Sequence, residues 1–322
     1  MQRLNPAERL AQANGKARSG APRKGPAKVK PATRADWVSG ARLRTLPLAI
    51  APVALGTGAA VVATGPGVFH AVEALLALMV ALCLQIGVNY ANDYSDGVRG
   101  TDAYRVGPAR LTGSGAARPA TVLRVALAFF ALAALAGLAL VLITAQWWLL
   151  LVGAAAIGAA WLYTGGKKPY GYFGLGELFV FVFFGLVATL GTTYVQAGTV
   201  NTESWLAGAG VGLIACAVLM VNNLRDRETD KLAGKRTLAV LLGNVASRVA
   251  FCVFLLVPFG VVAFFSLFYP LAYFTFFVLL LALPACLITA TAKTSRELVL
   301  ALQLTSLAAL GYGLLLGLAF AL

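Results

Sequence analysis

The amino-acid sequence predicts an all-α integral membrane protein, a bundle of about nine transmembrane helices with two Asp-rich motifs at cytoplasmic helix ends. Three observations support this fold class. Of 322 residues, 60% are hydrophobic and 12% are charged, about half the charged fraction of a soluble domain. Apolar segments of about 20 residues, enough to cross the hydrocarbon core of a bilayer, recur along the chain. The few acidic residues are concentrated in two short windows.

Hydropathy predicts nine membrane spans. We expect them at about residues 45–64, 71–92, 122–143, 146–164, 174–196, 205–223, 247–266, 270–291 and 298–320. Four prolines fall inside these spans (Pro47, Pro52, Pro258 and Pro284), which neighbouring helices tolerate by satisfying the freed backbone groups. We expect the aromatic runs of the fifth and eighth spans to pack between helices or to face lipid, and stabilisation of a cation is the alternative role.

The basic residues alternate between the two sides of this nine-span arrangement. All 26 Lys and Arg lie in the N-terminal segment and in the connections 2–3, 4–5, 6–7 and 8–9, including the adjoining helix ends, whereas the opposite connections hold none. Positively charged connections stay in the cytoplasm. We therefore expect a multi-pass protein of the cell (inner or plasma) membrane, with its N-terminus in the cytoplasm and its C-terminus outside.

Residues 1–36 form a basic N-terminal tail, and residues 37–322 form the membrane domain. The first 44 residues contain eleven Lys and Arg but only two acids, and they lack the apolar core of a signal peptide. We expect a disordered tail that contacts anionic lipid. No aromatic residues are interleaved with the basic ones, so the expected partner is the lipid bilayer and not nucleic acid.

Half of the twelve acidic residues lie in two windows at the cytoplasmic ends of the second and sixth spans. The first window, VNYANDYSDGVRGTD, contains Asn89, Asp93, Asp96 and Asp102, and the second, VNNLRDRETD, contains Asn222, Asp226, Glu228 and Asp230. Spacings of three and four residues place side chains on one face of a helix. Each window thus presents an amide and two carboxylates in one column, which suggests two related halves of the bundle.

Two acidic columns on the same side of the membrane call for a cation between them. An unpaired carboxylate costs roughly 2.5–3.5 kcal/mol at the depth of the hydrocarbon. Oxygen ligands suit Mg²⁺, which commonly bridges one or two carboxylates to substrate phosphates. Nearby basic residues can meet the remaining phosphate charge, among them Arg110, Lys167, Arg225 and Lys235. The sequence therefore predicts a magnesium and diphosphate site for a lipid diphosphate.

Three alternatives to a metal site account less well for these acids. A single acidic cluster at a helix end is often a solvated cap, although two matching clusters are harder to explain in this way. An ion-coupled transporter is the alternative from a different functional class, but its acids are expected near the membrane midplane. A scaffold without chemistry leaves both acidic columns unexplained.

At these residues the sequence resembles the UbiA superfamily of intramembrane aromatic prenyltransferases, nine-helix proteins with Asp-rich motifs after helices 2 and 6. The motif N-x-x-x-D-x-x-(x)-D corresponds to NYANDYSD, and D-x-x-x-D corresponds to DRETD. A Tyr-x-x-x-Lys element corresponds to Tyr163 and Lys167, where many relatives lack the basic residue. The stretches GPARLTGSG, YTGGKKPYGYFGLGE and NNLRDRETDKLAGKRTLAVLLG are most similar to members that prenylate 1,4-dihydroxy-2-naphthoate.

The resemblance implies a Mg²⁺-dependent reaction. A polyprenyl group would pass from polyprenyl diphosphate to 1,4-dihydroxy-2-naphthoate with decarboxylation, giving demethylmenaquinol, CO2 and diphosphate. The implied catalytic and metal-binding residues are Asp93, Asp96, Asp226 and Asp230. The implied substrate-binding residues are Asn89, Asn222, Arg110, Tyr163, Lys167, Arg225, Lys235 and Asp102. Acceptors such as 4-hydroxybenzoate and homogentisate remain alternatives.

Several of these residues have two possible roles. Asp102 is either a diphosphate-site residue or a loop acid paired with Arg99 or Arg105. Arg110 and Lys167 are either substrate contacts or basic anchors of the cytoplasmic side. Glu177, at the start of the fifth span, is either an acceptor contact or an interfacial glutamate.

Overall fold

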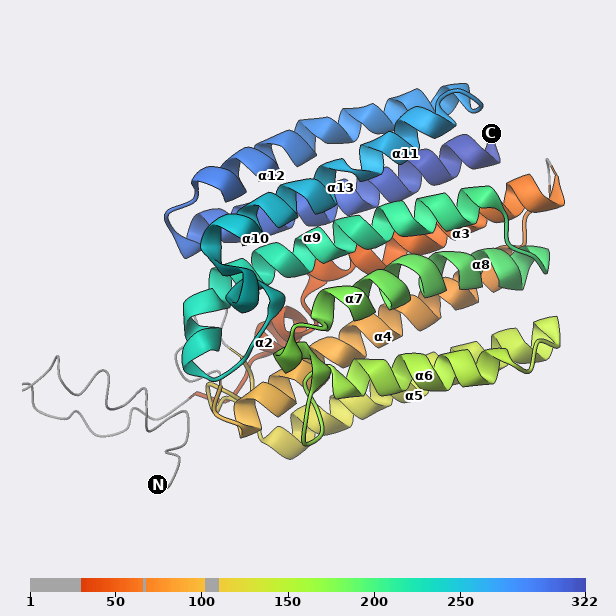
Figure 1. Ribbon diagram of the computed structural model, residues 1–322. Helices are drawn as coiled ribbons and strands as arrows, with labels where there is room; N and C mark the ends of the chain where they lie inside the picture. The colour runs from red at the N-terminus through yellow and green to blue at the C-terminus, as the bar shows by residue number, and fades with distance from the viewer. Residues whose placement is uncertain (1–29, 66–67, 102–109) are drawn as a thin grey trace, which may run out of the picture.

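The computed structural model describes residues 30–65, 68–101 and 110–322, and within these ranges the chain is helical and contains no strand. The long helices lie roughly side by side along one direction and form a bundle (Figure 1). The first described residues and the C-terminus lie at opposite ends of this bundle. The predicted all-helical fold class is confirmed. Asp102 and most of the basic tail lie outside the described residues.

The helices follow one another with short connections. In chain order they are α2 (Arg34–Gly40), the 3₁₀ turn η1 (Leu43–Thr45), α3 (Pro47–Thr64), α4 (Ala71–Val98), α5 (Pro119–Thr144), α6 (Leu149–Leu162), the 3₁₀ turn η2 (Tyr170–Phe173), α7 (Gly176–Val180), the π-helix η3 (Phe181–Val187), α8 (Ala188–Ala197), α9 (Thr202–Leu232), α10 (Leu238–Leu256), α11 (Pro258–Phe265), the 3₁₀ segment η4 (Pro270–Val278), α12 (Leu279–Thr291) and α13 (Ser295–Ala321).

Eight of the nine expected spans are helical segments long and apolar enough to cross a membrane, counted over the described residues. The remaining one, expected at 146–164, is α6, which has only 14 residues. Its axial rise of about 21 Å is less than the roughly 30 Å of a hydrocarbon core. Ala145, with φ of 57°, ends α5 in the left-handed region, and a turn at Gln146–Trp148 delays the start of α6.

Helices α4 and α9 continue further than hydropathy predicts. We expected them to end near residues 92 and 223, whereas they end at Val98 and Leu232. Their last turns consist of the polar motif residues, which lower the hydropathy but remain helical because neighbouring elements supply partners for them. Both motifs therefore lie on regular helical turns, with the residues spaced by four on one face.

Small residues allow the central helices to approach closely, as is common in membrane bundles. Helix α3 packs against α13, where a Cβ on Gly58 would lie 2.0 Å from the carbonyl oxygen of Gly317. The π-helix η3 packs on α9 in the same manner, with Gly185 against Gly212. The largest apolar core lies among α3, α9 and the helices from α10 to α13.

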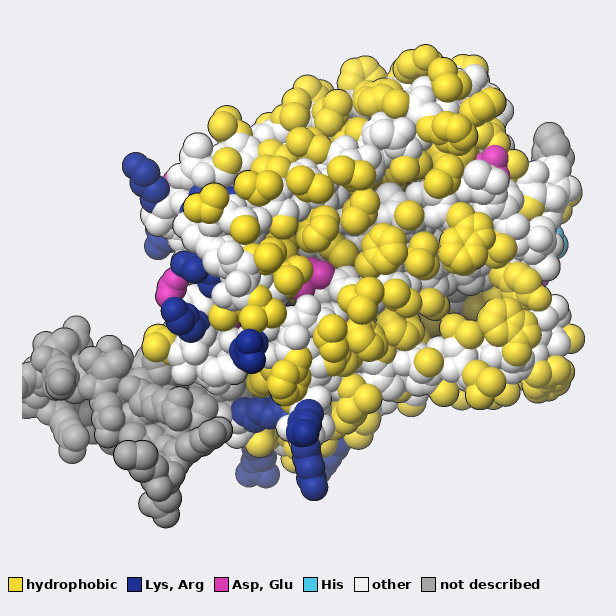
Figure 2. All heavy atoms as spheres, viewed as in Figure 1, with side chains coloured by type: hydrophobic (Ala, Val, Ile, Leu, Met, Phe, Trp, Pro, Cys, Tyr) yellow, Lys and Arg dark blue, Asp and Glu magenta, His cyan; other side chains and the backbone are white. Residues whose placement is uncertain are grey.

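The charged side chains gather at one end of the molecule. In Figure 2, Lys and Arg lie toward the end where the first described residues are found, while hydrophobic side chains cover much of the remaining visible face. An apolar belt with charges at one end fits a bundle inserted in a bilayer. The cytoplasmic placement of this end remains a prediction.

Candidate active site

Both acidic motifs open into one cavity of about 580 Å³. It lies on the opposite side of α3 and α9 from the main apolar core, between these helices and α4, α5, α6, α7 and α8. Its polar end is lined by residues of both motifs, namely Asn89, Asn92, Asp93, Asp96, Asn222, Asn223, Asp226 and Asp230. Segments 133 residues apart in sequence thus form one site.

Asp93 holds the chain that follows the first motif. Its two carboxylate oxygens accept hydrogen bonds from the backbone N–H groups of Leu111 (2.9 Å) and Thr112 (2.8 Å). The side chain is 3% exposed, so these charge-assisted bonds form away from bulk water. Asp93 thereby places Arg110 next to the cavity.

Asp96 is the meeting point of three separate segments. The hydroxyl of Tyr172 donates to its Oδ1 at 2.6 Å, and the ammonium of Lys235 lies 3.2 Å from the same oxygen. The guanidinium of Arg110 lies 3.6 Å from Oδ2. Two cations and a phenol therefore face one carboxylate of α4.

Lys235 links the two motifs. Its ammonium also lies 3.7 Å from Oδ1 of Asp230 on α9. Gly234, in the left-handed region with φ of 78°, ends α9, and the N–H of Lys235 then donates to the carbonyl of Asp230. Burial disfavours its charge, but the carboxylates of Asp96 and Asp230 outweigh this effect and raise the pKa of Lys235.

Asp226 and Arg225 form a pair within the second motif. The guanidinium of Arg225 donates to both carboxylate oxygens of Asp226, at 2.8 and 2.6 Å, and to the amide oxygen of Asn222 at 2.9 Å. The Arg225 side chain is buried and does not line the cavity, whereas Asp226 and Asn222 do. Arg225 thus contacts the predicted site residues rather than the space for a substrate.

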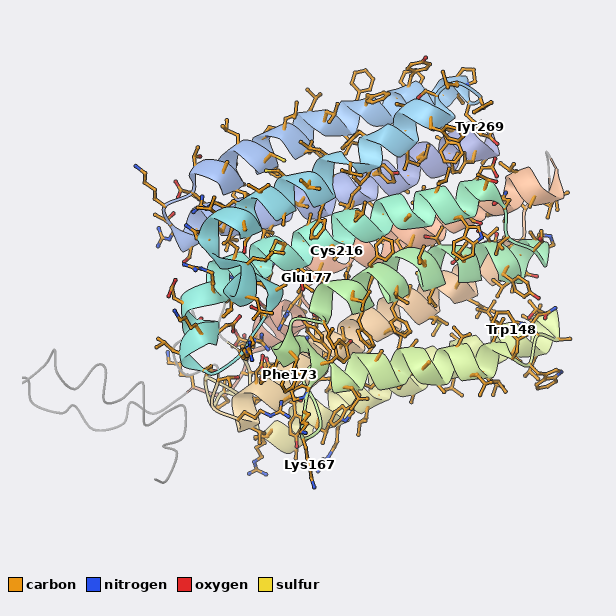
Figure 3. The ribbon with its side chains drawn as sticks, viewed as in Figure 1. Trp148, Lys167, Phe173, Glu177, Cys216 and Tyr269 are labelled. Carbon is orange, nitrogen blue, oxygen red and sulfur yellow. The ribbon has the colours of Figure 1, made fainter. Side chains whose placement is uncertain are left out.

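The two residues of the predicted Tyr-x-x-x-Lys element separate in the structure. Tyr163 lines the cavity, while Lys167 is exposed and points away from the bundle (Figure 3). Of the predicted site residues that the structure describes, Arg225 and Lys167 are the two that do not line the cavity.

Tyr172, which the sequence did not single out, takes the place expected for Lys167. It follows Tyr163 in the same connection, and its ring lies 4.7 Å from the ammonium of Lys235. Burial and the charge of Asp96 raise the pKa of Tyr172 to about 12. The phenol therefore stays protonated and donates to Asp96 at neutral pH.

Each motif contains a second asparagine that sequence reasoning passed over. Asn92 accepts a hydrogen bond from the hydroxyl of Thr164 at 2.6 Å, and Asn223 donates to Oε1 of Glu177 at 3.1 Å. Both asparagines line the cavity. Both asparagines are visible in the sequence, in NYAN and in NN. The spacing of the motif residues did not show that the helix faces carrying Asn92 and Asn223 also point toward the cavity. Glu177 is buried at the start of α7 beside α9 (Figure 3).

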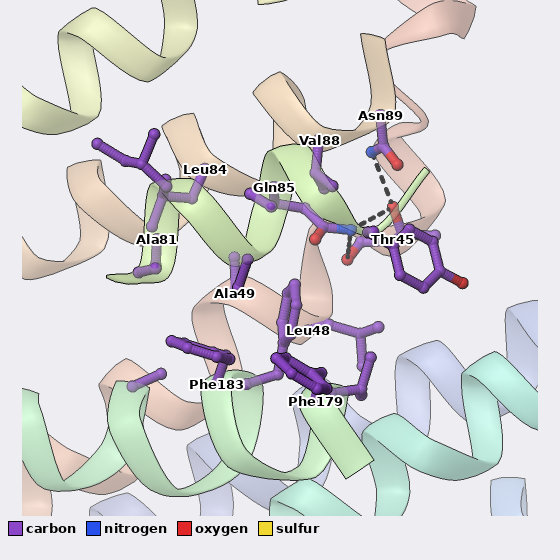
Figure 4. A pocket seen from close by; sticks show the side chains of 18 of the residues that line it. Thr45, Leu48, Ala49, Ala81, Leu84, Gln85, Val88, Asn89, Phe179 and Phe183 are labelled. Atoms are coloured by element: carbon purple, nitrogen blue, oxygen red, sulfur yellow. Dashed lines mark hydrogen bonds between the residues drawn. The ribbon is translucent and has the colours of Figure 1, made fainter. Parts of the chain in front are cut away.

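Most of the remaining lining of the cavity is apolar and aromatic. Leu48, Phe179 and Phe183 form a wall below the polar group of Thr45, Gln85 and Asn89 (Figure 4). The ring of Phe179 stacks on Tyr170 at 4.0 Å between centroids. Part of this wall belongs to the π-helix η3, and such helices often occur at functional sites. The aromatic run of the fifth span, which was expected to pack or to face lipid with cation stabilisation as the alternative, therefore also lines the cavity.

The donor set fits Mg²⁺ that arrives together with a diphosphate. Among the described residues, no group of three or more His, Cys, Asp or Glu side chains could hold a metal by itself. Mg²⁺ needs less than this, because it keeps several waters and takes one or two carboxylates together with substrate phosphates. Asp96 and Asp230 contact the same ammonium and face the same cavity, and they would supply those carboxylates.

Comparison with known proteins identifies relatives over most of the chain. A 1,4-dihydroxy-2-naphthoate octaprenyltransferase of Mycobacterium tuberculosis is 51% identical over 300 residues, covering 88% of this chain and 96% of the relative. A protein of the same name from Escherichia coli is 42% identical over 218 residues, covering 66% of this chain and 70% of the relative.

Two solved structures share the fold. The apo structure of a UbiA homolog from Aeropyrum pernix matches with a TM-score of 0.62 at 18% identity, covering 82% of this chain and 95% of that one. A UbiA homolog from Archaeoglobus fulgidus bound to DMAPP and Mg²⁺ matches with a TM-score of 0.58 at 16% identity, covering 87% of this chain and 98% of that one. The UbiA prenyltransferase family matches residues 49–307. With this match and the close relatives, the chain belongs to the UbiA prenyltransferase family.

Proposed function

We propose that this protein transfers a polyprenyl group from polyprenyl diphosphate to 1,4-dihydroxy-2-naphthoate, in a Mg²⁺-dependent reaction that releases CO2 and diphosphate and gives demethylmenaquinol. The observation that carries the proposal is that both acidic motifs line the same cavity. At its polar end Arg110 and Lys235 contact Asp96, and the neighbouring wall is apolar and aromatic. The names of the most similar relatives support the acceptor. A structural neighbour bound to DMAPP and Mg²⁺ supports the donor and the metal.

The polar end of the cavity would bind the diphosphate. Bound Mg²⁺ would neutralise part of the charge that develops on the leaving diphosphate. Lys235 and Arg110 would neutralise more of it, because they are held in place by Asp96 before the substrate arrives. In this arrangement Asp96 and Asp230 would face the metal, with Asp93 and Asp226 fixing the neighbouring backbone and side chains.

The apolar part would hold the prenyl chain and the developing allylic cation. The C–O bond of the donor breaks, and its electron pair goes to the diphosphate oxygen. Phe179, Phe183 and Leu48 would exclude water that could capture the cation. The rings would also favour the positive charge through their π-faces.

The acceptor would complete the reaction without a redox partner. The electron-rich ring carbon bearing the carboxylate attacks the allylic carbon, forming a C–C bond. The bond from this ring carbon to the carboxylate then breaks, its electron pair restores the aromatic ring, and CO2 leaves. We further propose that the reaction takes place at the cytoplasmic side of the cell membrane, as the distribution of basic residues favours.

A panel of acceptors tests the function. Membranes containing the protein are supplied with polyprenyl diphosphate, Mg²⁺ and one of 1,4-dihydroxy-2-naphthoate, 4-hydroxybenzoate or homogentisate. Prenylated product is expected with the naphthoate alone, and it should disappear with EDTA and in the Asp93→Ala and Asp226→Ala variants. Turnover with 4-hydroxybenzoate and none with the naphthoate would contradict the proposed acceptor. Full activity in EDTA would contradict the proposed Mg²⁺ dependence.

A further inference from the structure

The turn that precedes α3 brings polar groups into the cavity that neither acidic motif accounts for. Arg42 enters this turn in the left-handed region with φ of 53°. The turn is fixed from two sides, because the amide of Asn89 donates to the carbonyl of Ala41 at 3.0 Å and the hydroxyl of Ser306 donates to the carbonyl of Arg44 at 2.5 Å. The turn therefore holds its side chains in defined positions.

Gln85 of α4 presents a carbonyl oxygen whose direction is set by this turn. The hydroxyl of Thr45 donates to the carbonyl of Arg42 at 2.9 Å, so its oxygen is left to accept from Nε2 of Gln85 at 2.8 Å (Figure 4). The same Nε2 lies 3.4 Å from the carbonyl of Thr45. Because both partners accept, the amide nitrogen faces the turn and Oε1 faces away from it.

Among the residues that the structure describes, that oxygen has no hydrogen-bond partner. Gln85 is 5% exposed and lines the cavity, and no hydrogen bond reaches its Oε1 from the described part of the chain. A buried acceptor left without a donor is costly to the fold. A ligand with a hydroxyl group would satisfy it.

Arg44 presents a cation to the same cavity. Among the described residues, no hydrogen bond or ion pair engages its guanidinium, although it is half-buried. Asp226, the acid whose charge acts on it, already accepts two hydrogen bonds from Arg225. Burial and the charge of Arg225 lower the pKa of Arg44, but a guanidinium stays charged at neutral pH. Arg44 therefore has room for an anionic ligand.

We propose that Arg44 and Gln85 form a subsite for the polar edge of the aromatic acceptor, with the guanidinium binding its carboxylate and Oε1 accepting from the hydroxyl on the neighbouring ring carbon. This inference rests on the proposed function, since 1,4-dihydroxy-2-naphthoate carries these two groups side by side. The fork of an arginine matches a carboxylate in two parallel hydrogen bonds. Leu48 and Ala49, which lie below Gln85 in Figure 4, would contact the ring.

Three aromatic probes separate the two contacts by direct binding to the purified full-length protein. They are 1-hydroxy-2-naphthoate, which has both groups, 2-naphthoate, which has only the carboxylate, and 1-naphthol, which has only the hydroxyl. The wild-type protein should bind the first probe about tenfold more tightly than either of the others. Similar affinities for all three in the wild type would overturn the subsite without the use of any variant.

The variants then assign each group to a residue. Arg44→Gln should weaken both carboxylate probes about tenfold and leave 1-naphthol unchanged. Gln85→Leu should weaken both hydroxyl probes and leave 2-naphthoate unchanged. Arg44→Lys should recover part of the loss, because it keeps the charge without the fork. Arg124→Gln, an exposed cation on α5, is the matched control and should bind all three probes as the wild type does.

Turnover distinguishes this inference from the proposed function. The Arg44→Gln variant should have a KM for 1,4-dihydroxy-2-naphthoate that is raised about tenfold and an unchanged KM for polyprenyl diphosphate. A raised KM for the diphosphate alone would place Arg44 at the donor and overturn the subsite. Absence of wild-type turnover with the naphthoate, alongside probe binding that follows the predicted pattern, would contradict the proposed function and leave the subsite supported.

Discussion

The ammonium of Lys235 lies 3.2 Å from the carboxylate of Asp96, although the two residues are 139 positions apart. This contact joins the connection after α9 to the end of α4, and it places a fixed positive charge where the two acidic motifs meet. Asp230 shares the same ammonium at 3.7 Å. One cation thereby keeps two carboxylates together.

Replacing Lys235 should remove activity more than stability. The Lys235→Gln variant is expected to lower kcat about 100-fold, because a preorganised charge at the leaving group is lost. Lys235→Arg should retain part of the rate. The control is Lys231→Gln on the exposed face of the same helix end, which should leave kcat within about twofold of the wild type. Equal losses at both lysines would contradict a specific role for Lys235.

Breaking the Arg225–Asp226 pair should destabilise the fold. Removing one partner of a buried ion pair costs about 3–5 kcal/mol, because the remaining charge is left uncompensated. Asp226→Asn should therefore lower the melting temperature in detergent as well as the activity. The double variant Arg225→Gln/Asp226→Asn should recover much of the melting temperature but not the activity. Recovery of both would show that Asp226 has no role at the substrate.

Tyr172 should act as a neutral donor across the physiological range. Its pKa of about 12 lies above the unfolded value of about 10. Burial and the neighbouring charge of Asp96 favour the neutral phenol in the folded state, so its contribution to stability is fully present below pH 10 and is lost as the pH rises from about 10 to 12. The ultraviolet titration of the wild type minus that of Tyr172→Phe should show one phenol titrating near pH 12. A difference titration near pH 10 would contradict the buried contact.

Lys167 provides a contrast within the same connection. Because its side chain is exposed and directed away from the cavity, Lys167→Gln should change kcat and the KM for polyprenyl diphosphate by less than about twofold. A tenfold rise in that KM would restore the role that the Tyr-x-x-x-Lys element suggested.

The close approach of α3 and α13 should be intolerant of larger side chains. Gly58→Val would place atoms on the carbonyl of Gly317, and overpacking of this kind costs about 1–3 kcal/mol. The apparent melting temperature should fall accordingly. Gly260→Ala on α11, where a Cβ meets open space, is the matched control and should melt like the wild type.

The sequence was sufficient to predict the fold class, because composition, span length and the alternation of basic residues all depend on local patterns. Hydropathy placed the ends of α4 and α9 too early, since polar residues such as Asp96 and Asp230 lower the average even when they remain helical. Hydropathy also overestimated the length of α6, because it does not detect the left-handed residue at Ala145.

The candidate site was only partly predictable for a related reason. Spacings of three and four residues on one helix identify a shared face, and they placed Asp93, Asp96, Asp226 and Asp230 correctly on the cavity. They do not reveal which residue of another segment faces that column. Tyr172 instead of Lys167, and the turn bearing Arg44 beside Gln85, depend on tertiary contacts that no local pattern records.

The most direct test follows the carboxylate of the acceptor during a single reaction. Purified full-length protein is given polyprenyl diphosphate, Mg²⁺ and 1,4-dihydroxy-2-naphthoate labelled in its carboxyl group, and released CO2 and diphosphate are counted together. We predict one CO2 for each diphosphate, with no release of either in the Asp96→Ala or Asp230→Ala variants. Diphosphate release without CO2, or equal release in those variants, would contradict prenyl transfer to the naphthoate at the cavity where the two motifs meet.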